Sequence, residues 1–496
     1  MGREIELKFD IEPGVAGRIA RSEALASTTG DRTRYETLYF DTADGALRRA
    51  GFSLRIRRSG DRYVQTIKRK KASSAGLFVR QEWEEEVADF TLRADALKRT
   101  PLRRWAARAG GGEILPLIRS EITRNAWQIR HRGSRIEVVL DRGRICSGEK
   151  DAPIGELEIE LIRGRPSALF DLACSFGEKA ALRLGVLSKS ERGYALAEGR
   201  LGRAAKAERP ALTPPVTEAE AFATIAYACL RHFRLNEMVL LERDDPEALH
   251  QARVALRRLR SAIKLFRPTL HGKDEHKLRG ELRWFARHFG EARNLGVLLE
   301  RLESARIDEA VIAPLREAHA KAHRQIARAL RSKRARTLFL ELILWIETGS
   351  WRAGPRASED LAGLAVEQLE KRWKQVAKRA RDFDLQGAEE RHELRIAVKA
   401  MRYSAEFLAP LYADKSVAAR RDKFIGALKT LQDGLGDLND AWTAEQMAKG
   451  LPGRLREAIV AAHPPRESRK ALAAAFKALD RADAAAGYWR EPASDA

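Results

Sequence analysis

The order of apolar and polar residues divides the chain into two parts. Up to about residue 200, apolar and polar residues alternate with period two, which is typical of strands that turn one face toward a core. Helical periodicity interrupts this pattern at 92–109 and 166–185. We therefore predict an antiparallel barrel or a strongly curved sheet with a few helices. The alternating segments are EIELKFDI, ETLYFDT, FSLRIRRS, RYVQTIKRK, LFVRQEWEEEV, SRIEVVLDRGRI and GELEIELIRG.

The second part begins after a change in composition. Residues 201–216 are rich in Ala and Pro and have no periodicity, so they are predicted to be a linker. Thr217 and Glu220 have the spacing of a capping box, and helical periodicity continues from there to about residue 490. The chain is thus predicted to be an α+β multidomain protein. Its expected segments are a strand domain at 1–200, a linker at 201–216, a helical domain at 217–490 and a tail at 491–496.

The helical part contains an internal repeat. HQARVALRRLRSAIKLFRP starts at His250, and HELRIAVKAMRYSAEFLAP starts at His392. Arg recurs three and ten residues after each His, a base recurs after seven, and Pro recurs after eighteen. A looser match follows each copy, at 289–299 and 435–445. We therefore predict two pseudo-symmetric helical bundles.

Composition points to an anionic partner. The formal net charge is +22, with 92 Lys plus Arg against 70 Asp plus Glu in 496 residues. This excess suits nucleic acid, polyphosphate or an acidic membrane surface. The three cysteines show no metal-binding or disulfide spacing, and neither a signal peptide nor a membrane-spanning stretch is visible. We expect a cytoplasmic protein, and one that binds polyphosphate could associate with polyphosphate granules.

The polar faces of the predicted strands are almost entirely charged. Glu4, Glu6 and Lys8 share one face in EIELKF, and similar faces recur on the other strands, with acids and bases largely segregated. One such strand alone would suggest an ordinary solvated face. If the strands close with these faces inward, basic strands would hold a polyanion and acidic strands would hold divalent cations.

Several spaced motifs make the first part resemble a known superfamily. The ExExK motif at Glu4–Lys8, YFDT at 39–42, LRIR at 54–57, ELEIEL at 156–161 and SKSERGYAL at 188–196 resemble the landmarks of the CYTH superfamily, the triphosphate tunnel metalloenzymes. This resemblance implies an eight-stranded closed barrel that hydrolyses triphosphate with Mg²⁺ or Mn²⁺. No P-loop motif is present.

The resemblance also implies roles for individual residues. The expected catalytic residues are Glu4, Glu6 and Lys8. The expected metal ligands are Glu4, Glu6 and Asp141, together with acids among Glu156, Glu158 and Glu160, which period two places on one face. The expected substrate-binding residues are Lys8, Arg55, Arg57, Lys68, Arg124 and Lys189.

The two copies of the repeat carry a basic stripe. Positions 0, 3, 7 and 10 of a helix fall on one face, and no acid lies between His250 and Lys264 to offset the repulsion. A bound anion is therefore favoured over a plain solvated face. The expected polyphosphate-binding residues are His250, Arg253, Arg257, Arg260, Lys264, His392, Arg395, Lys399 and Arg402.

This part resembles the CHAD domain, the conserved-histidine α-helical domain that often follows CYTH. The resemblance rests on HxxRVxxRRLR and on LNDAW at 438–442, and it implies two helical bundles around a basic pocket for inorganic polyphosphate. Arg293-Asn294-Leu295-Gly296 departs from the family's Arg-Asp-x-Asp pattern. His319 and His323 have a spacing that suits a metal, but no acid accompanies them in the sequence, so an ordinary surface pair is favoured.

Four functions fit these features to different degrees. The favoured one is a metal-dependent triphosphatase that acts on inorganic triphosphate or polyphosphate. The alternatives are a non-catalytic polyphosphate-binding adaptor, a class IV-type adenylate cyclase, and a nucleic-acid binder. Nucleic acid is disfavoured because no helix-turn-helix, zinc finger or aromatic RNA-binding motif is visible. The sequence decides neither the oligomeric state nor the preferred substrate.

Overall fold

A computed structural model shows the fold of the protein. Two compact units make up the chain, and each is described by itself. The first contains residues 1–205, 234–241 and 330–348, and the second contains 206–233, 242–329 and 349–496. The residues described are 2–70, 75–93, 95, 100–103, 113–381, 387–448, 453–462 and 465–490.

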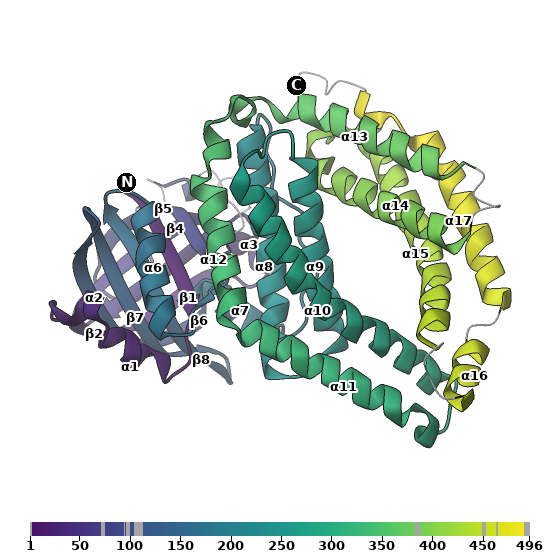
Figure 1. The fold of residues 1–496 in the computed structure, drawn as a ribbon. Coiled ribbons are helices and arrows are strands. Elements are labelled where there is room, and N and C mark those ends of the chain that lie inside the picture. The colour runs from purple at the N-terminus through teal and green to yellow at the C-terminus, as the bar shows by residue number, and fades with distance from the viewer. Residues whose placement is uncertain are drawn as a thin grey trace. The chain divides into compact units, whose positions relative to one another are not determined.

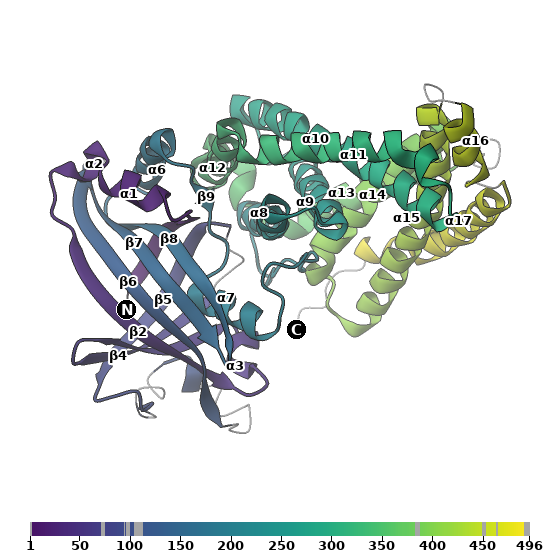
Figure 2. The ribbon, with the colours of Figure 1, turned by 90° about the horizontal axis from the view of Figure 1, so that it is seen from below.

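A closed antiparallel barrel forms the center of the first unit (Figures 1 and 2). The strands are hydrogen-bonded in the order β5-β4-β3-β2-β6-β7-β8-β1, and β1 also pairs with β5, which closes the ring. The short β9 (Arg183–Leu184) adds to the end of β1. The predicted barrel is therefore confirmed. Its strands are β1 (Gly2–Asp10), β2 (Asp31–Thr42), β3 (Phe52–Ser59), β4 (Arg62–Lys70), β5 (Leu77–Val87), β6 (Ile114–His131), β7 (Ser134–Ser147) and β8 (Lys150–Arg163).

The burial of residues along β1 shows which face of the strand points into the barrel. Leu7 and Phe9 are buried on one face, yet Glu6 and Lys8 on the opposite face are also only 5% and 2% exposed. A strand whose polar face is as buried as its apolar face cannot have that polar face toward solvent. The charged residues therefore line the inside of the barrel.

Short helices cover the barrel. They are α1 (Val15–Ala20), α2 (Glu23–Ala26), α3 (Ala46–Arg49), α6 (Ser167–Lys179) and α7 (Lys189–Ala197). Helix α6 lies against β1 and β8 and buries its apolar face, as the helical pattern at 166–185 predicts. The helical pattern at 92–109 lies mostly outside the described residues. Helix α7 packs Tyr194 against Ile118 and Ile145, so an apolar cluster adjoins the charged interior.

Long helices form the rest of the chain. Helix α8 begins with the predicted capping box, since Glu220 N donates to Thr217 Oγ1 and the Glu220 carboxylate accepts from Thr217 N. The helices are α8 (Glu218–Glu242), α9 (Pro246–Leu265), α10 (Lys273–Ser304), α11 (Glu309–Arg331), α12 (Lys333–Thr348), α13 (Leu361–Arg379), α14 (Ala388–Leu408), α15 (Lys415–Ala448), α16 (Gly453–Ala461) and α17 (Pro465–Ala485). Short 3-10 turns lie at Ser350–Ala353, Pro355–Ser358, Ala409–Leu411 and Tyr488–Arg490. None of the helices in the described ranges has the length and apolar character needed to cross a bilayer.

The second unit repeats one element order. Helices α8, α9 and α10 correspond to α13, α14 and α15, and α9 lies against α14. The first helices of the two halves start side by side, because Thr217 and Asp360 form an antiparallel bridge. Glu218 N donates to Glu359 O, and Leu361 N donates to Val216 O. This reciprocal pairing gives the two predicted halves a local two-fold relation.

Candidate active site and polyanion-binding face

Three buried carboxylates meet inside the barrel. Asp141 on β7 is directly opposite Glu156 on β8, and Glu158 lies two residues further along β8 on the same face. Asp141 and Glu156 are fully buried, and Glu158 is 12% exposed. One oxygen from each lies within 4.8 Å of the others. Carboxylate oxygens at this spacing are suitable ligands for a hard divalent cation.

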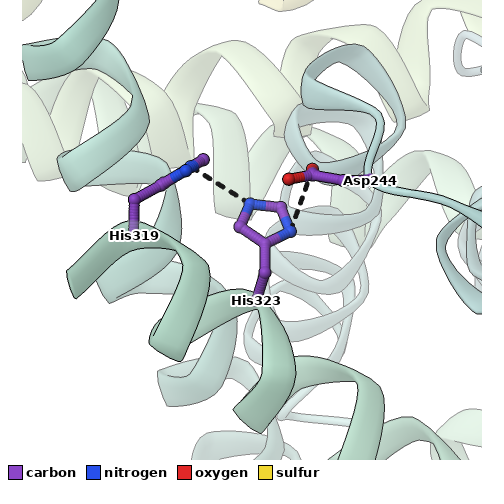
Figure 3. Close-up of side chains that lie close together, drawn as sticks. All are labelled: Asp244, His319 and His323. Atoms are coloured by element: carbon purple, nitrogen blue, oxygen red, sulfur yellow. Dashed lines mark hydrogen bonds and ion pairs between the residues drawn. The ribbon is translucent and has the colours of Figure 1, made fainter. Parts of the chain in front are cut away.

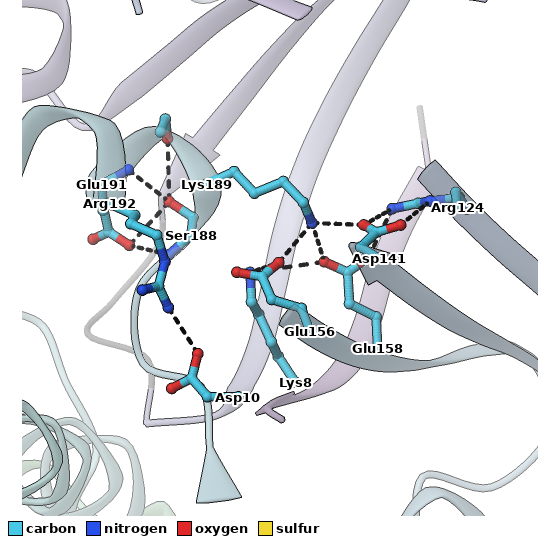
Figure 4. A network of polar contacts seen from close by, with 11 residues as sticks. Lys8, Asp10, Arg124, Asp141, Glu156, Glu158, Ser188, Lys189, Glu191 and Arg192 are labelled. Carbon is cyan, nitrogen blue, oxygen red and sulfur yellow. Dashed lines mark hydrogen bonds and ion pairs between the residues drawn. The ribbon is translucent and has the colours of Figure 1, made fainter. Parts of the chain in front are cut away.

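Three cations surround these acids (Figure 4). Lys189 Nζ lies 2.7, 2.7 and 2.9 Å from oxygens of Asp141, Glu156 and Glu158. Lys8 Nζ lies 2.7 Å from Glu156. Arg124 donates to both oxygens of Asp141, at 2.8 and 2.6 Å, and to Glu158 at 3.0 Å. The acids and bases thus neutralise one another within a single network.

The network keeps its carboxylates ionised. Burial would raise the pKa of Glu158, but the attraction of Lys189, Arg124 and Lys8 outweighs it and holds that pKa well below its ordinary value. The pKa of Asp141 and that of Glu156 are lowered by the same balance, in which Lys189 is the largest attractive partner. Burial would lower the pKa of Lys189, yet the three acids raise it well above the usual range. All four groups are therefore charged at neutral pH.

One carboxylate oxygen shows that the acids fit a metal ion. Glu156 Oε1 is buried and accepts no hydrogen bond within the described residues, although Glu156 Oε2 lies 2.7 Å from both lysines. A buried oxygen without a donor is costly unless a ligand satisfies it. The donor set of Asp141, Glu156 and Glu158 consists of oxygens alone, which suits Mg²⁺ or Mn²⁺.

A second group of bases lies on the neighbouring inner face of β3 and β4. Lys68 and Arg55 lie 3.2 and 3.6 Å from Glu82 of β5. Arg57 packs on the ring of Tyr35, and Arg124 lies over the same ring. Burial, followed by repulsion from Arg55 and Arg124, lowers the pKa of Arg57 to about 10. Bases gathered against their mutual repulsion are suited to binding a polyanion.

The remaining predicted acids lie apart from the three-carboxylate cluster. Glu6 is buried and is opposite Glu160, which is in turn opposite Glu137 on β7. These three residues form a second acidic level on the same inner face. Among the described residues, the group that could hold a metal ion inside the barrel contains neither Glu6 nor Glu160. The side chain of Glu4 lies outside the described residues.

Some residues of this region were not singled out from the sequence. Asp10 continues the alternation of Glu6 and Lys8, and it accepts a hydrogen bond from Arg192 of α7 at 2.8 Å. Ser188 caps α7 and accepts from Glu191 N at 3.2 Å, which fixes the start of the helix that carries Lys189. The period-two pattern could have indicated Asp10, and the S-x-x-E spacing could have indicated Ser188.

The basic stripes of the two repeats face each other in the second unit. Burial, then Arg257 and Arg395, lowers the pKa of Arg253 to about 10. Lys399 shows the largest effect, because burial followed by repulsion from Arg395, Arg257 and Arg253 lowers its pKa to about 6. Helices α9 and α14 therefore bring like charges together where they face each other. Arg260 and Lys264 extend this basic face toward Arg279, Arg283 and Arg372.

The second match of each repeat lies beside the corresponding histidine. His392 Nδ1 lies 2.5 Å from Asn439 Oδ1, and Arg395 lies 3.9 Å from Asp440. In the first copy, Arg293 stands where the second copy has Asn439. Burial and then Arg293 lower the pKa of His250. The first copy thus has a positive charge where the second copy has a neutral amide. Arg402 donates to Gln432 at 3.0 Å and also pairs with Glu406.

Models of two known domain families match successive parts of the chain. A CYTH domain family model matches residues 2–194, and a CHAD domain family model matches residues 224–449. The chain therefore contains a CYTH domain followed by a CHAD domain.

Individual relatives cover parts of the chain. An inorganic triphosphatase of Haemophilus influenzae is 27% identical over 199 residues, which are 40% of this chain and 55% of that protein. The chain thus matches about half the length of that relative. The CHAD domain from the plant Ricinus communis is 28% identical and covers 58% of this chain and 97% of its own, with a TM-score of 0.45. A proposed adenylyl cyclase from Hippeastrum, described as having a dominant triphosphatase activity, is 23% identical and covers 40% and 97%, with a TM-score of 0.31.

Proposed function

We propose that the barrel hydrolyses inorganic triphosphate, or the ends of polyphosphate, with the help of a divalent cation. The observation that carries this proposal is the interlocked cluster of Asp141, Glu156 and Glu158 with three bases inside a closed barrel. A site for phosphate alone would gain nothing from three buried carboxylates, and a site for a metal alone would gain nothing from the bases.

The residues divide into two roles in this proposal. Asp141, Glu156 and Glu158 would hold Mg²⁺ or Mn²⁺, and Glu6 and Glu160 form an acidic level next to them. Lys8, Arg124 and Lys189 would turn from the carboxylates to phosphate oxygens, and Arg55, Arg57 and Lys68 would hold the rest of the chain of phosphates. A bound cation would supply neutralisation of phosphate charge and polarisation of the scissile bond.

The bases also explain how the chain would promote cleavage. In the transition state of phosphoryl transfer, negative charge spreads over the equatorial and leaving oxygens. Lys189 and Arg124 are held inside the barrel by two or three carboxylate partners each, so both positive charges are already in place beside the site where substrate would bind. Burial of the network keeps competing water away from these contacts.

The experiment that tests this proposal measures phosphate release from tripolyphosphate by the purified full chain. We expect release with Mg²⁺ or Mn²⁺, at ~1 per second or faster, and loss of release with excess chelator. Asp141→Asn should remove release, whereas Asp171→Asn, at an exposed position on α6, should not. Absence of release with every divalent metal would refute hydrolysis and favour a binding protein. Formation of cyclic nucleotide from ATP would instead favour a cyclase.

We further propose that the basic face of the second unit binds inorganic polyphosphate. The supporting observation is the depressed pKa of Lys399 and of Arg253, which burial lowers and which repulsion between the bases of α9 and α14 lowers further. A linear polyanion would relieve this repulsion at many positions at once. Attachment of this domain to the barrel would raise the local concentration of phosphate chains for hydrolysis. Binding of labelled polyphosphate in excess RNA would test it, because loss of the signal to RNA would show general polyanion binding.

A further inference from the structure

Three side chains of the second unit form a cluster that neither the barrel chemistry nor the basic face uses (Figure 3). His319 and His323 lie one turn apart on α11, and their Nε2 atoms are 3.1 Å apart. The other ring nitrogen of His323, Nδ1, lies 2.9 Å from Asp244 Oδ1. Asp244 belongs to the turn between α8 and α9, 75 and 79 residues before the two histidines. The sequence favoured an ordinary surface pair because no acid accompanied the two histidines, and this reason is wrong because Asp244 lies beside His323.

The contact with Asp244 determines which ring nitrogen of His323 carries the proton. A carboxylate accepts, so His323 Nδ1 carries the proton and its Nε2 presents a lone pair toward His319. His319 Nε2 can then either donate a proton to that lone pair or present a second lone pair beside it. In the second case no proton lies between the two Nε2 atoms, and both lone pairs are available to bind one cation.

The separation of the nitrogens suits two ligands of one metal ion. Nitrogens bound at about 2.0–2.1 Å to Zn²⁺ lie roughly 3.0–3.4 Å apart when they occupy neighbouring positions. The observed 3.1 Å falls in this range. The Asp244–His323 contact has the form of the outer carboxylate that orients a metal-bound imidazole and increases its basicity.

The neighbouring helix leaves room beside His319. Gly296 of α10 faces this ring, and a Cβ atom added there would be 3.1 Å from His319 Nε2. A side chain at 296 would therefore crowd the atom that is to bind the ion. His323 is 14% exposed and Asp244 is 52% exposed, so the cluster lies at the surface and an ion can reach it.

We propose that His319 and His323 bind one late first-row transition metal ion, of the Zn²⁺, Co²⁺ or Ni²⁺ type, with Asp244 as the orienting carboxylate. Imidazole nitrogen selects this class over Mg²⁺. Two protein nitrogens leave the other coordination positions to water or to a small anion. Because Asp244 lies between α8 and α9, its contact with His323 connects the metal site on α11 to that turn.

Co²⁺ is a suitable probe, because its visible absorption reports nitrogen coordination. Full-length, tag-free protein is titrated with Co²⁺ in excess Mg²⁺, which occupies oxygen sites such as the barrel carboxylates. We expect one equivalent with an imidazole-type spectrum in the wild type. His319→Gln should lose this equivalent although its amide can still donate to His323. His276→Ala removes an exposed histidine of α10 and should keep it.

Further variants separate this site from the barrel and from misfolding. Asp141→Asn should retain the Co²⁺ equivalent, and Asp244→Asn should retain the spectrum with roughly 10–100-fold weaker binding. Each variant is compared with the wild type by metal-free thermal unfolding. Retention of the full equivalent in His319→Gln, or its loss in Asp141→Asn, would overturn the proposal. Failure of the proposed hydrolysis would leave this result unchanged, because the readout is metal binding alone.

Discussion

The inner face of the barrel and the basic face of the helical unit use the same residue types in opposite ways. In the barrel, Lys8, Arg124 and Lys189 each contact at least one buried carboxylate. Across α9 and α14, repulsion from the bases Arg395, Arg257 and Arg253 adds to burial and outweighs the attraction of Asp440 for Lys399. Attraction raises the pKa of Lys189, whereas burial and repulsion lower that of Lys399.

This difference suggests a division of labour. In the barrel, the acids and bases are paired with one another. A metal cation would have to bind the acids and a phosphate anion the bases before the pairs separate, and metal-assisted cleavage of phosphate requires both ligands. A face of opposed bases needs only an anion, and any linear polyanion of suitable spacing relieves the repulsion. Five measurements would test this comparison.

The largest expected effect follows loss of one barrel carboxylate. Glu158→Gln should lower metal-dependent hydrolysis of tripolyphosphate by on the order of 10²-fold or more, because it removes a ligand and one partner of Lys189 and Arg124. Polyphosphate binding by the helical unit should persist. Glu6→Gln should reduce hydrolysis less, because Glu6 lies outside the three-carboxylate cluster. An equal or larger loss in Glu6→Gln would show that the second acidic level holds the essential metal.

The next effect concerns the basic face. Arg253→Glu combined with Arg395→Glu should weaken binding of long polyphosphate by about tenfold or more and make it less sensitive to salt, since fewer counterions are released. Hydrolysis of tripolyphosphate should be unchanged. Arg328→Glu, at an exposed position on α11, changes the charge without touching this face and serves as the control. Equal weakening by Arg328→Glu would indicate that net charge alone drives binding.

A smaller effect concerns pH. With a pKa of about 6, Lys399 is mostly neutral in the free protein at pH 8. A bound polyanion would raise this pKa, so Lys399 would take up a proton when the polyanion binds. Affinity should therefore fall as pH rises above 6, by at most about tenfold per pH unit for one proton. Calorimetry in buffers of different ionisation enthalpy measures the uptake directly. Lys399→Arg should flatten the profile, and an unchanged slope in that variant would place the proton elsewhere.

The same depressed pKa has a consequence for stability of the free protein. A lysine whose folded pKa lies below its ordinary value binds more protons in the unfolded state between those two values. Its contribution to stability therefore increases as pH rises from about 6 toward 10, and it is least favourable below pH 6. Thermal unfolding of the wild type and of Lys399→Met across this range should differ most at the acidic end.

The smallest effect concerns helix caps. Ser188→Ala should cost about 1 kcal/mol of stability and reduce hydrolysis several-fold, because the cap positions Lys189. Thr217→Ala removes the equivalent capping box of α8 at a similar cost in stability. It should leave hydrolysis unchanged. If both variants lowered hydrolysis equally, general destabilisation rather than placement of Lys189 would explain the loss.

Much of the fold was visible in the sequence because one-dimensional periodicity carries it. The period of two in β1 placed Glu6 and Lys8 on one face, and the spacing of Thr217 and Glu220 marked the start of α8. The domain boundaries drawn from composition remain predictions. Register was not visible, because Glu156, Glu158 and Glu160 all satisfy period two equally. Pairing of β7 with β8 separated them, since it placed Asp141 opposite Glu156.

The sequence by itself determined which residues share a face, where the helices begin, and that two copies of a basic stripe exist. Local backbone geometry and side-chain chemistry suffice for these features. Only the tertiary structure decided which faces meet. It brought the bases of α9 and α14 together, it paired Arg124 with Asp141, and it placed Asp244 beside His323. Such contacts depend on strand register and helix packing between distant segments, and no local pattern encodes them.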